Sequence, residues 1–319
     1  MLKPTCGELL EKLEASVARN RADALLLSGG LDSTILASIL RPEYSVAAGL
    51  GTAAPDLAFA RQAGQKYSST HVEEIFDEER MAEMVDAVVQ AFKTFDPIEI
   101  RNSCVALTGL ERAKHDGYSK VMTGDGGDEL FAGYNYLSRY YNDFDELEQE
   151  LERLWEVMHF SSKPLGEKIG VEIATPFLDT EFAKFAKSID AGEKVGEYGG
   201  HKYGKFILRR CFEPEIGALA WRPKMAQEQG AATDRFCNFI EKMIDDATFA
   251  NKSMIAMSEG VRIRNKEHLN YYAIFRSYFP PPQEESGDCY KVCPECHACF
   301  SKGRFCRTCG AFPVTPISP

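Results

Sequence analysis

The sequence predicts an α/β protein built on a doubly wound parallel sheet, followed by a helical second half and a small cysteine-rich module. Three observations lead to this fold class. Short apolar runs of strand length alternate with segments of helical length as far as residue 123, a pattern typical of parallel sheets with helices on both faces. Beyond residue 135 the strand pattern disappears, and six of the ten cysteines lie in the last 31 residues.

The individual elements follow from local signals. The first helix begins at a capping box, because Thr5 and Glu8 have the spacing that satisfies free backbone N–H groups. A later helix is expected to begin at Pro55, a residue favoured in the first helical turn. The expected strands are 24–28, 44–50, 71–76 and 119–123, and the expected helices are 5–20, 34–40, 55–67, 78–95, 103–116 and 143–157.

Composition and charge exclude several classes of protein. The chain is 44% hydrophobic and 27% charged, the balance of a soluble globular protein. No apolar run approaches the roughly 18 residues needed to cross a bilayer, and the N-terminus carries charges where a secretory signal needs apolar residues. A net charge of −11 argues against a protein wrapped in nucleic acid. We therefore expect a cytoplasmic protein with no membrane partner.

The strongest motif is Ser28-Gly-Gly-Leu-Asp-Ser33, between an expected strand and an expected helix. Two glycines let the backbone approach a phosphate, and the helix start offers free N–H groups. Asp32 cannot face a phosphate directly, so it is expected to hold a magnesium ion that bridges phosphates. A simple capped turn is the alternative interpretation.

A second glycine-rich run, Thr123-Gly-Asp-Gly-Gly-Asp-Glu129, follows the fourth expected strand. Its glycines and carboxylates suit a loop pressed against a ligand and its metal. Both runs follow strands of the same sheet, and open parallel sheets bind ligands at the carboxyl ends of their strands. Together the two runs predict one nucleotide site.

The order of these and later motifs resembles the synthetase domain of the asparagine synthetase family, a group of N-type ATP pyrophosphatases with an adenine nucleotide alpha hydrolase-like fold. The resemblance covers roughly residues 20–235 and includes GVEIATPFLD (170–179), KFILRRCF (205–212) and AWRPKMAQEQG (220–230). It implies an ATP-dependent ligase that adenylates a carboxylate, with aspartate the best guess, releases pyrophosphate, and forms an amide with ammonia.

The resemblance also implies roles for single residues. Those matching the family's ATP site are Leu26 and Ala48 at adenine, Thr123 and Gly124 at the AMP portion, and Ser28, Gly29, Gly30, Asp32 and Ser33 at pyrophosphate. Asp32 and Asp128 match magnesium ligands, and Lys205 matches the lysine that neutralises developing phosphate charge. Arg101 and Glu172 align with residues of the acceptor side.

Two departures from the family lie on that acceptor side. Asp125 replaces a glutamate in the second glycine-rich loop and is shorter by one methylene, about 1.5 Å. Ala174 replaces an arginine, which removes a bidentate partner for a carboxylate. We therefore expect a weak site for aspartate that Ala174→Arg improves, or a site reshaped for a larger acid.

The nitrogen donor is expected to be free ammonia. About 27 residues precede the first glycine-rich run, and residue 2 is Leu where the family's glutaminase has its cysteine nucleophile. Cys6 cannot use its own α-amino group as a base and is expected to be an ordinary helix cysteine. A separate glutaminase subunit is the alternative source.

The C-terminal cysteines resemble a zinc ribbon. Cys293, Cys296, Cys306 and Cys309 form two CxxC knuckles that supply four thiolates to zinc, and Gly310 permits the closing turn. An iron–sulfur site, using the surplus Cys289, His297 and Cys299, is the alternative. The expected boundaries are a synthetase-like domain at 1–279, a linker at 280–288, the ribbon at 289–312 and a disordered tail at 313–319, with the ribbon separable from the domain at the linker.

Two other functions remain open at this point. Lys291, Lys302, Arg304 and Arg307 make the ribbon basic, which suits a tRNA-modifying ATP pyrophosphatase that holds RNA there, although such residues are often only solvated. A protein partner at the ribbon is a further alternative. A non-catalytic nucleotide-binding regulator is the third hypothesis. In that case the altered acceptor side would indicate that catalytic activity has been lost.

Overall fold

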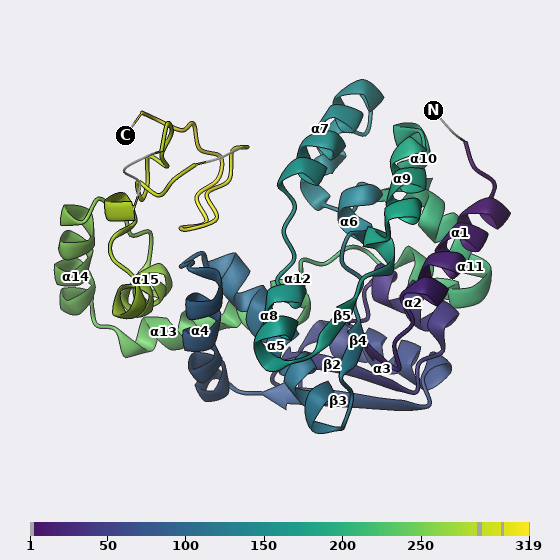
Figure 1. Ribbon diagram of the computed structural model, residues 1–319, viewed down its shortest axis with the longest axis horizontal. Helices are drawn as coiled ribbons and strands as arrows, with labels where there is room; N and C mark the ends of the chain where they lie inside the picture. Colours follow the sequence, from purple (N-terminus) through teal and green to yellow (C-terminus); the bar gives the residue numbers. More distant parts are fainter. Residues whose placement is uncertain (1–2, 286–288, 301–302, 319) are drawn as a thin grey trace.

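A five-stranded parallel sheet forms the centre of the molecule (Figure 1). The computed structural model describes residues 3–285, 289–300 and 303–318. The sheet has the order β3-β2-β1-β4-β5, and its strands are β1 (Ala24–Leu26), β2 (Tyr44–Leu50), β3 (Thr70–Phe76), β4 (Lys120–Met122) and β5 (Glu172–Ala174). The chain adds β2 and β3 on one side of β1 and then returns to add β4 and β5 on the other side. The order of the strands therefore reverses between β1 and β4.

Helices cover both faces of this sheet. In the first half they are α1 (Cys6–Arg19), α2 (Leu31–Leu40), α3 (Pro55–Tyr67), α4 (Glu78–Phe92), α5 (Pro97–His115) and α6 (Gly127–Leu130). The second half contains α7 (Phe144–Val157), α8 (Ser162–Ile169), α9 (Thr180–Ser188), α10 (Ala191–Lys194), α11 (Phe206–Ile216), α12 (Gln227–Gly230), α13 (Phe236–Met243), α14 (Asp246–Ser258) and α15 (Lys266–Tyr278). Within the described ranges, none of the helices has both the length and the apolar composition that a bilayer crossing requires.

The side chains of β1 show how the two faces are filled. Ala24 and Leu26 belong to the apolar cluster that includes residues of α4, α5 and α15. Leu25 and Leu27 belong to the cluster that includes residues of α1, α2, α3 and α11. Successive residues of a strand point to opposite faces, so a short run of apolar residues is enough to fix this strand in the middle of the sheet.

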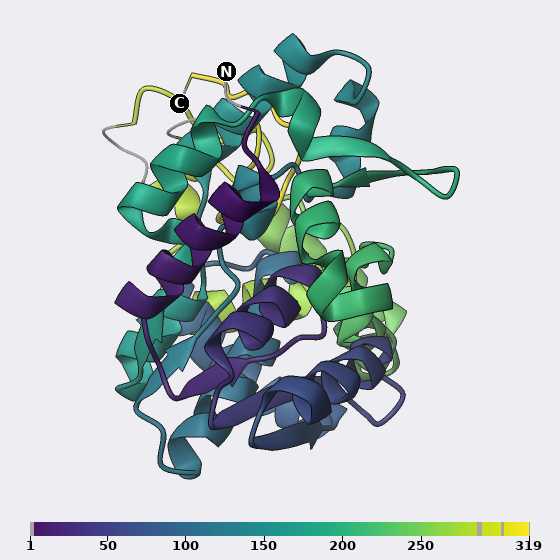
Figure 2. The ribbon, with the colours of Figure 1, turned by 90° about the vertical axis from the view of Figure 1, so that its right-hand side faces the viewer.

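The structure confirms the predicted α/β class and the four strands expected from sequence, within one or two residues at their ends. The expectation that no strand follows residue 135 is wrong. Strand β5 escaped detection because it has only three residues. A two-stranded hairpin, β6 (Val195–Tyr198) and β7 (His201–Gly204), was also missed, because its strands are short and largely polar. This hairpin projects from the body of the molecule (Figure 2).

The cysteine-rich module packs against the helical body. Buried Cys293, Cys306 and Val314 belong to the same apolar cluster as Phe95 and Phe275. This region and α1 lie at opposite ends of the long axis (Figure 1). The expected linker is partly built into the structure, since Pro281 and Pro282 are buried and a short 3-10 turn covers Pro282–Glu285; residues 286–288 lie outside the described ranges, as does Lys302.

The tail and two cysteine pairs differ from expectation. The tail is not disordered as far as residue 318: Val292 and Ile317 exchange backbone hydrogen bonds of 2.9 and 3.0 Å. Cys6 is not an ordinary helix cysteine, because it forms a disulfide with Cys211, 205 positions away. Cys289 and Cys299 form a second disulfide. Pairing between distant cysteines depends on the folded helices, so spacing alone could not indicate it.

Candidate active site

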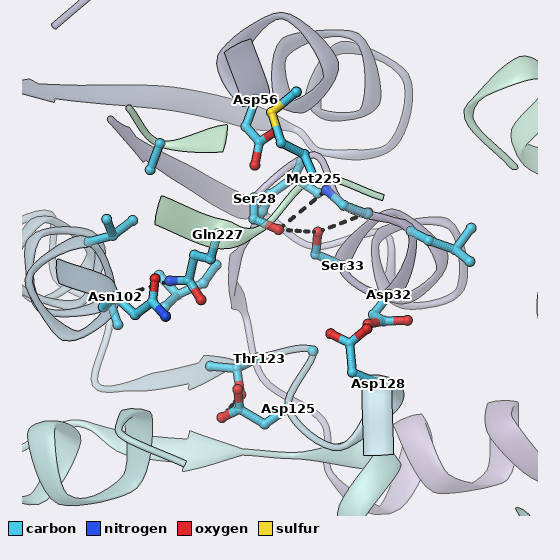
Figure 3. A pocket seen from close by; sticks show the side chains of 18 of the residues that line it. Ser28, Asp32, Ser33, Asp56, Asn102, Thr123, Asp125, Asp128, Met225 and Gln227 are labelled. Atoms are coloured by element: carbon cyan, nitrogen blue, oxygen red, sulfur yellow. Dashed lines mark hydrogen bonds between the residues drawn. The ribbon is translucent and has the colours of Figure 1, made fainter. Parts of the chain in front are cut away.

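A cavity of about 390 Å³ opens where β1 and β4 end. This is the switch point of the sheet, where the chain turns to opposite sides after neighbouring strands, and ligands of doubly wound folds bind there. Figure 3 shows Ser28 and Ser33 on one side of the cavity, Thr123 and Asp125 across from them, and Asn102 beside Gln227 on a third side. The two glycine-rich runs therefore meet as the sequence predicted.

The first run forms a glycine-rich turn leading into α2. Ser28 Oγ lies 3.1 Å from Ser33 Oγ and accepts a hydrogen bond from the Gly30 N–H at 3.3 Å. Asp32 lies in the first turn of α2, so its backbone N–H belongs to the positive end of the helix. The second run approaches closely: a Cβ on Gly127 would lie 2.5 Å from Asp32 Cγ. A side chain at Gly127 would therefore displace the Asp32 carboxylate.

A buried charge cluster lies where these loops meet. Lys205, only 3% exposed, pairs with Asp32 and, at 2.7 Å, with Asp128. Lys224 pairs with the other oxygen of Asp128 at 2.8 Å. Lys205 itself has a left-handed backbone, with φ of 55°, at the turn from β7 into α11. The two glycine-rich runs, which the sequence predicts to form one site, therefore lie together with Lys205, the residue that the family resemblance assigned to the phosphates.

The charges in this cluster shift one another's pKa values. Burial opposes ionisation of Asp128, but Lys205 and Lys224 outweigh it and hold the pKa of Asp128 below its usual range. Burial raises the pKa of Asp32. Burial alone would lower the pKa of Lys205, but Asp128 and Asp32 reverse that effect and raise it. The cluster is thus a fixed ammonium held between two carboxylates.

The residues present fit a magnesium ion. Asp32 Oδ1 is buried and has no hydrogen-bond partner, and a carboxylate oxygen left in that state is costly unless a ligand completes it. Asp32 and Asp128 supply the hard oxygen ligands that Mg²⁺ prefers. These two side chains are the ones that would hold the ion, which would neutralise phosphate charge when bound.

Asp125 lies on the opposite side of the cavity and is held by two hydroxyls. Thr123 donates to Asp125 Oδ2 at 2.9 Å, and Ser162, the first residue of α8, donates to the same oxygen. Burial raises the pKa of Asp125, and these two hydrogen bonds partly offset the effect. A carboxyl group with a raised pKa in a cavity is suited to accepting or giving a proton.

The apolar end of the cavity suits an adenine ring. Leu26 and Ala48, both assigned to adenine from sequence, line it together with Val105 and Ala106 of α5. A Cβ on Gly109 would lie 2.9 Å from Leu26 Cδ2, so α5 lies close to β1 here. Asn102 Oδ1 is buried and lacks a partner, while Gln227 Nε2 donates to the Asn102 backbone carbonyl at 3.3 Å.

Two residues assigned to the acceptor side lie elsewhere. Arg101 lies outside the cavity, 3.6 Å from the buried carboxylate of Glu267 on α15. Its neighbour Asn102 is the one that lines the cavity, because adjacent helical residues point in different directions. Glu172 begins β5, at the far end of the sheet, where it is exposed and pairs with Lys120 at 2.8 Å.

Ala174 is also absent from the cavity wall. It is 4% exposed and belongs to the apolar cluster on one face of the sheet. An arginine there would bury a charged group in a hydrophobic core, which is costly without a partner. Ala174→Arg is therefore not a route to a tighter aspartate site, contrary to the expectation from sequence.

Several cavity residues were missed by sequence reasoning. Arg222 pairs with Asp56, and its guanidinium also donates to the Gly29 carbonyl. The motif AWRPKMAQEQG contains Arg222 and Lys224 and was recognised, but neither residue was given a role. Other cavity residues left unassigned are Glu99, Asn102, Glu129, Tyr134, His159, Ser162 and Arg209. Ser162 carried no sequence signal, since only the fold brings α8 to Asp125.

The four knuckle cysteines form a compact sulfur cluster. All four are buried, and their sulfur atoms lie within 4.8 Å of one another. The Cys293–Cys309 and Cys296–Cys306 sulfur distances are 3.9 and 3.7 Å. Tetrahedral zinc with Zn–S bonds of about 2.3 Å requires sulfur separations of about 3.8 Å. Cys289 and Cys299 bond to each other instead, so the chemistry of this donor set fits zinc.

Comparison with known proteins agrees with this geometry. The family model described as "Asparagine synthase" matches residues 8–169 and 165–276. The chain belongs to the asparagine synthase family. Asparagine synthetase B [glutamine-hydrolyzing] of Escherichia coli (strain K12) is 30% identical over 310 residues, which cover 86% of this chain and 54% of that protein.

Other relatives give the same picture. The glutamine-hydrolyzing asparagine synthetase of Bos taurus is 27% identical over 285 residues, covering 82% of this chain and 50% of that protein. The chain therefore spans about half the length of the curated relatives it matches. A solved structure titled as a predicted subunit of tRNA methyltransferase from Methanocaldococcus jannaschii shares 18% identity over 60% of this chain and 86% of its own, with a TM-score of 0.28, too low to support any conclusion.

Proposed function

We propose that this chain is an ATP-dependent, AMP-forming ligase that activates a carboxylate and converts it to an amide with ammonia. One observation carries the proposal: a single cavity joins the phosphate-type turn at Ser28 to the Lys205 charge cluster and, on the opposite side, to Asp125. The chain's membership of the asparagine synthase family supports the same reaction class.

Each group in the cavity has a role in this reaction. The turn at Ser28 and the start of α2 bind pyrophosphate oxygens through N–H and hydroxyl donors. The Lys205 ammonium, already fixed between carboxylates, stabilises negative charge that develops as the phosphate bond breaks. Asp125 accepts a proton from the attacking ammonia, and Thr123 and Ser162 hold its carboxylate in place.

Aspartate is the acceptor we test first. Every cation lining the cavity already has protein partners: Lys205 and Lys224 bind carboxylates, Arg222 binds Asp56, and Arg209 donates to three backbone carbonyls. An acid with a second carboxylate would have to compete for one of these cations. We therefore propose that aspartate binds with poor apparent affinity.

The deciding experiment is ATP–pyrophosphate exchange with a panel of carboxylic acids and with tRNA. Stimulation by aspartate supports aspartate as the acceptor. Stimulation by a different acid, and not by aspartate, would refute aspartate as the acceptor but still support the adenylation reaction. Salt-sensitive stimulation by tRNA would favour the nucleic-acid-modifying alternative, and no exchange with any of them would favour a non-catalytic regulator. Amide formation with ammonium chloride, but not with glutamine, tests the nitrogen donor.

A further inference from the structure

The second knuckle of the ribbon, Cys306–Gly310, contacts the chain immediately before α5. The Phe95 N–H donates to the Thr308 carbonyl at 2.8 Å. Thr94, 2% exposed, donates through its hydroxyl to the Arg307 carbonyl at 2.6 Å. A Cβ on Gly310 would lie 2.1 Å from Asp96 Oδ1, and Asp96 is the N-cap of α5. The knuckle therefore fits against the start of α5 at backbone distance.

The same knuckle also contacts the segment between α7 and α8. The Arg307 guanidinium donates to the backbone carbonyl of Val157, which is the last residue of α7. A Cβ placed on Gly303 would lie 3.6 Å from Val157 Cγ1, so the ribbon touches this residue at two places. Burial lowers the pKa of His159, on which the charges of Glu99 and Arg307 act in opposite directions, so these three groups lie near one another.

Both contacted segments lead directly into the cavity wall. Glu99 and Asn102 of α5 line the cavity a few residues after the Thr94–Asp96 contact. His159 and Phe160 line it directly after Val157, followed by Ser162, which holds Asp125. The ribbon thus contacts two segments that are far apart in sequence, and each of them leads within a few residues into the part of the wall beside Asp125.

We propose that the second knuckle is a positioning element of the reaction: it fixes the start of α5 and the 158–161 segment, and through them the acceptor wall beside Asp125. Arg307 and Thr94 are its positioning residues. Four thiolates on one zinc would make the knuckle rigid, since a structural zinc site contributes folding energy to its small module. Among the described residues no hydrogen bond or ion pair joins the ribbon to the phosphate turn at 28–33, so the turn is expected to be independent of the ribbon. The acceptor assignment rests on the proposed function, whereas the mechanical link does not.

Hydrogen–deuterium exchange on the 319-residue, metal-loaded chain tests the link without any acceptor. Arg307→Ala is compared with Arg304→Ala, an exposed arginine of the same ribbon. Loss of the Val157 contact is expected to speed hydrogen exchange about five- to tenfold in 158–163 and to leave 28–34 unchanged, as expected for the loss of one hydrogen bond made by an exposed side chain. Arg304→Ala is expected to match the wild type in both segments.

A second pair of variants protects the test against a folding defect in Arg307→Ala. Thr94→Val keeps the shape of the side chain but removes the hydroxyl that donates to the Arg307 carbonyl and accepts from the Asp96 N–H, whereas Thr94→Ser keeps that hydroxyl. Exchange in 97–103 is expected to rise in Thr94→Val and to return to the wild-type rate in Thr94→Ser. Unchanged exchange in Arg307→Ala and Thr94→Val, or an equal rise throughout the chain, overturns the proposal.

Ligand measurements then separate positioning from general stability. MgATP affinity, measured by calorimetry, is expected to stay within twofold of the wild type in Arg307→Ala. If aspartate supports ATP–pyrophosphate exchange, the KM for aspartate in Arg307→Ala is expected to rise about tenfold while the KM for ATP does not change. An equal loss of affinity for ATP and for aspartate would refute a role confined to the acceptor wall. If no acid supports ATP–pyrophosphate exchange, the proposed function fails. The hydrogen–deuterium exchange and MgATP affinity results still decide whether the ribbon positions the wall.

Discussion

Replacing Lys205 by Met tests the buried charge cluster most directly. The variant keeps most of the side-chain volume but leaves the carboxylates of Asp32 and Asp128 facing each other without the ammonium that lies 2.7 Å from Asp128. Removing one partner of a buried ion pair costs about 3–5 kcal/mol. Because Lys205 is 3% exposed, we expect the full loss in the free energy of unfolding, measured by urea titration in magnesium-free buffer.

Magnesium should act differently on the variant and the wild type. In Lys205→Met the two carboxylates have lost a cation, so Mg²⁺ is expected to bind between them and restore about 2.7 kcal/mol when present at a hundred times its Kd. In the wild type the ammonium competes for the same oxygens, and the gain without ATP should be small.

Lys224→Met is the matched control for Lys205→Met. Lys224 is 32% exposed, and its ion pair with Asp128 is the single one it forms among the described residues, so its loss should cost about 1 kcal/mol or less. Equal destabilisation in the two variants, or the same response to magnesium as in the wild type, would refute the assigned roles.

Three further predictions concern the phosphate loop, the ribbon and a buried acid. Asp32→Asn should lower pyrophosphate release at least about a hundredfold with an unchanged circular dichroism spectrum; near-normal turnover would remove Asp32 from the site. Metal analysis should find one zinc per chain, lost in Cys306→Ser and retained in Cys299→Ser; iron with sulfide in the purified protein would contradict it. Burial and the Asp128 charge raise the pKa of Glu129 from an ordinary 4.5 to about 7, so the stability provided by its proton is complete below pH 4.5 and is lost as pH rises through 7. Glu129→Gln should therefore be more stable than the wild type at pH 8, by up to about 3 kcal/mol at 1.36 kcal/mol per pH unit, and as stable as the wild type at pH 4.5. Urea unfolding measures both proteins at both pH values. A stability difference between them that is the same at pH 8 and pH 4.5 would exclude this titration.

The sequence predicted those parts of the site that follow directly from strand ends. Ser28, Asp32 and Thr123 each lie within a few residues of a buried strand, so parallel pairing alone brings them together. Lys205 depended on family resemblance, because it follows a hairpin too short and polar to detect from its pattern.

The acceptor side was the part that sequence could not place. Arg101 was assigned to it one helical position away from Asn102, and a one-residue change on a helix moves the side chain by about 100°. Ser162 reaches Asp125 only through the packing of α8. The ribbon was expected to be separable, yet its backbone contacts with Thr94 and Phe95 involve carbonyl groups that no residue pattern reports.

Trp221 makes the cationic side of the site accessible to optical measurement. Its ring stacks on Tyr198 of the hairpin at 3.8 Å, and the next residue, Arg222, reaches the phosphate turn through the Gly29 carbonyl. The chain has only two tryptophans, and the other, Trp155, lies on α7. With Trp155 replaced by Phe, the emission of a single indole would report nucleotide binding in real time, so stopped-flow fluorescence could time ATP entry separately from every later step.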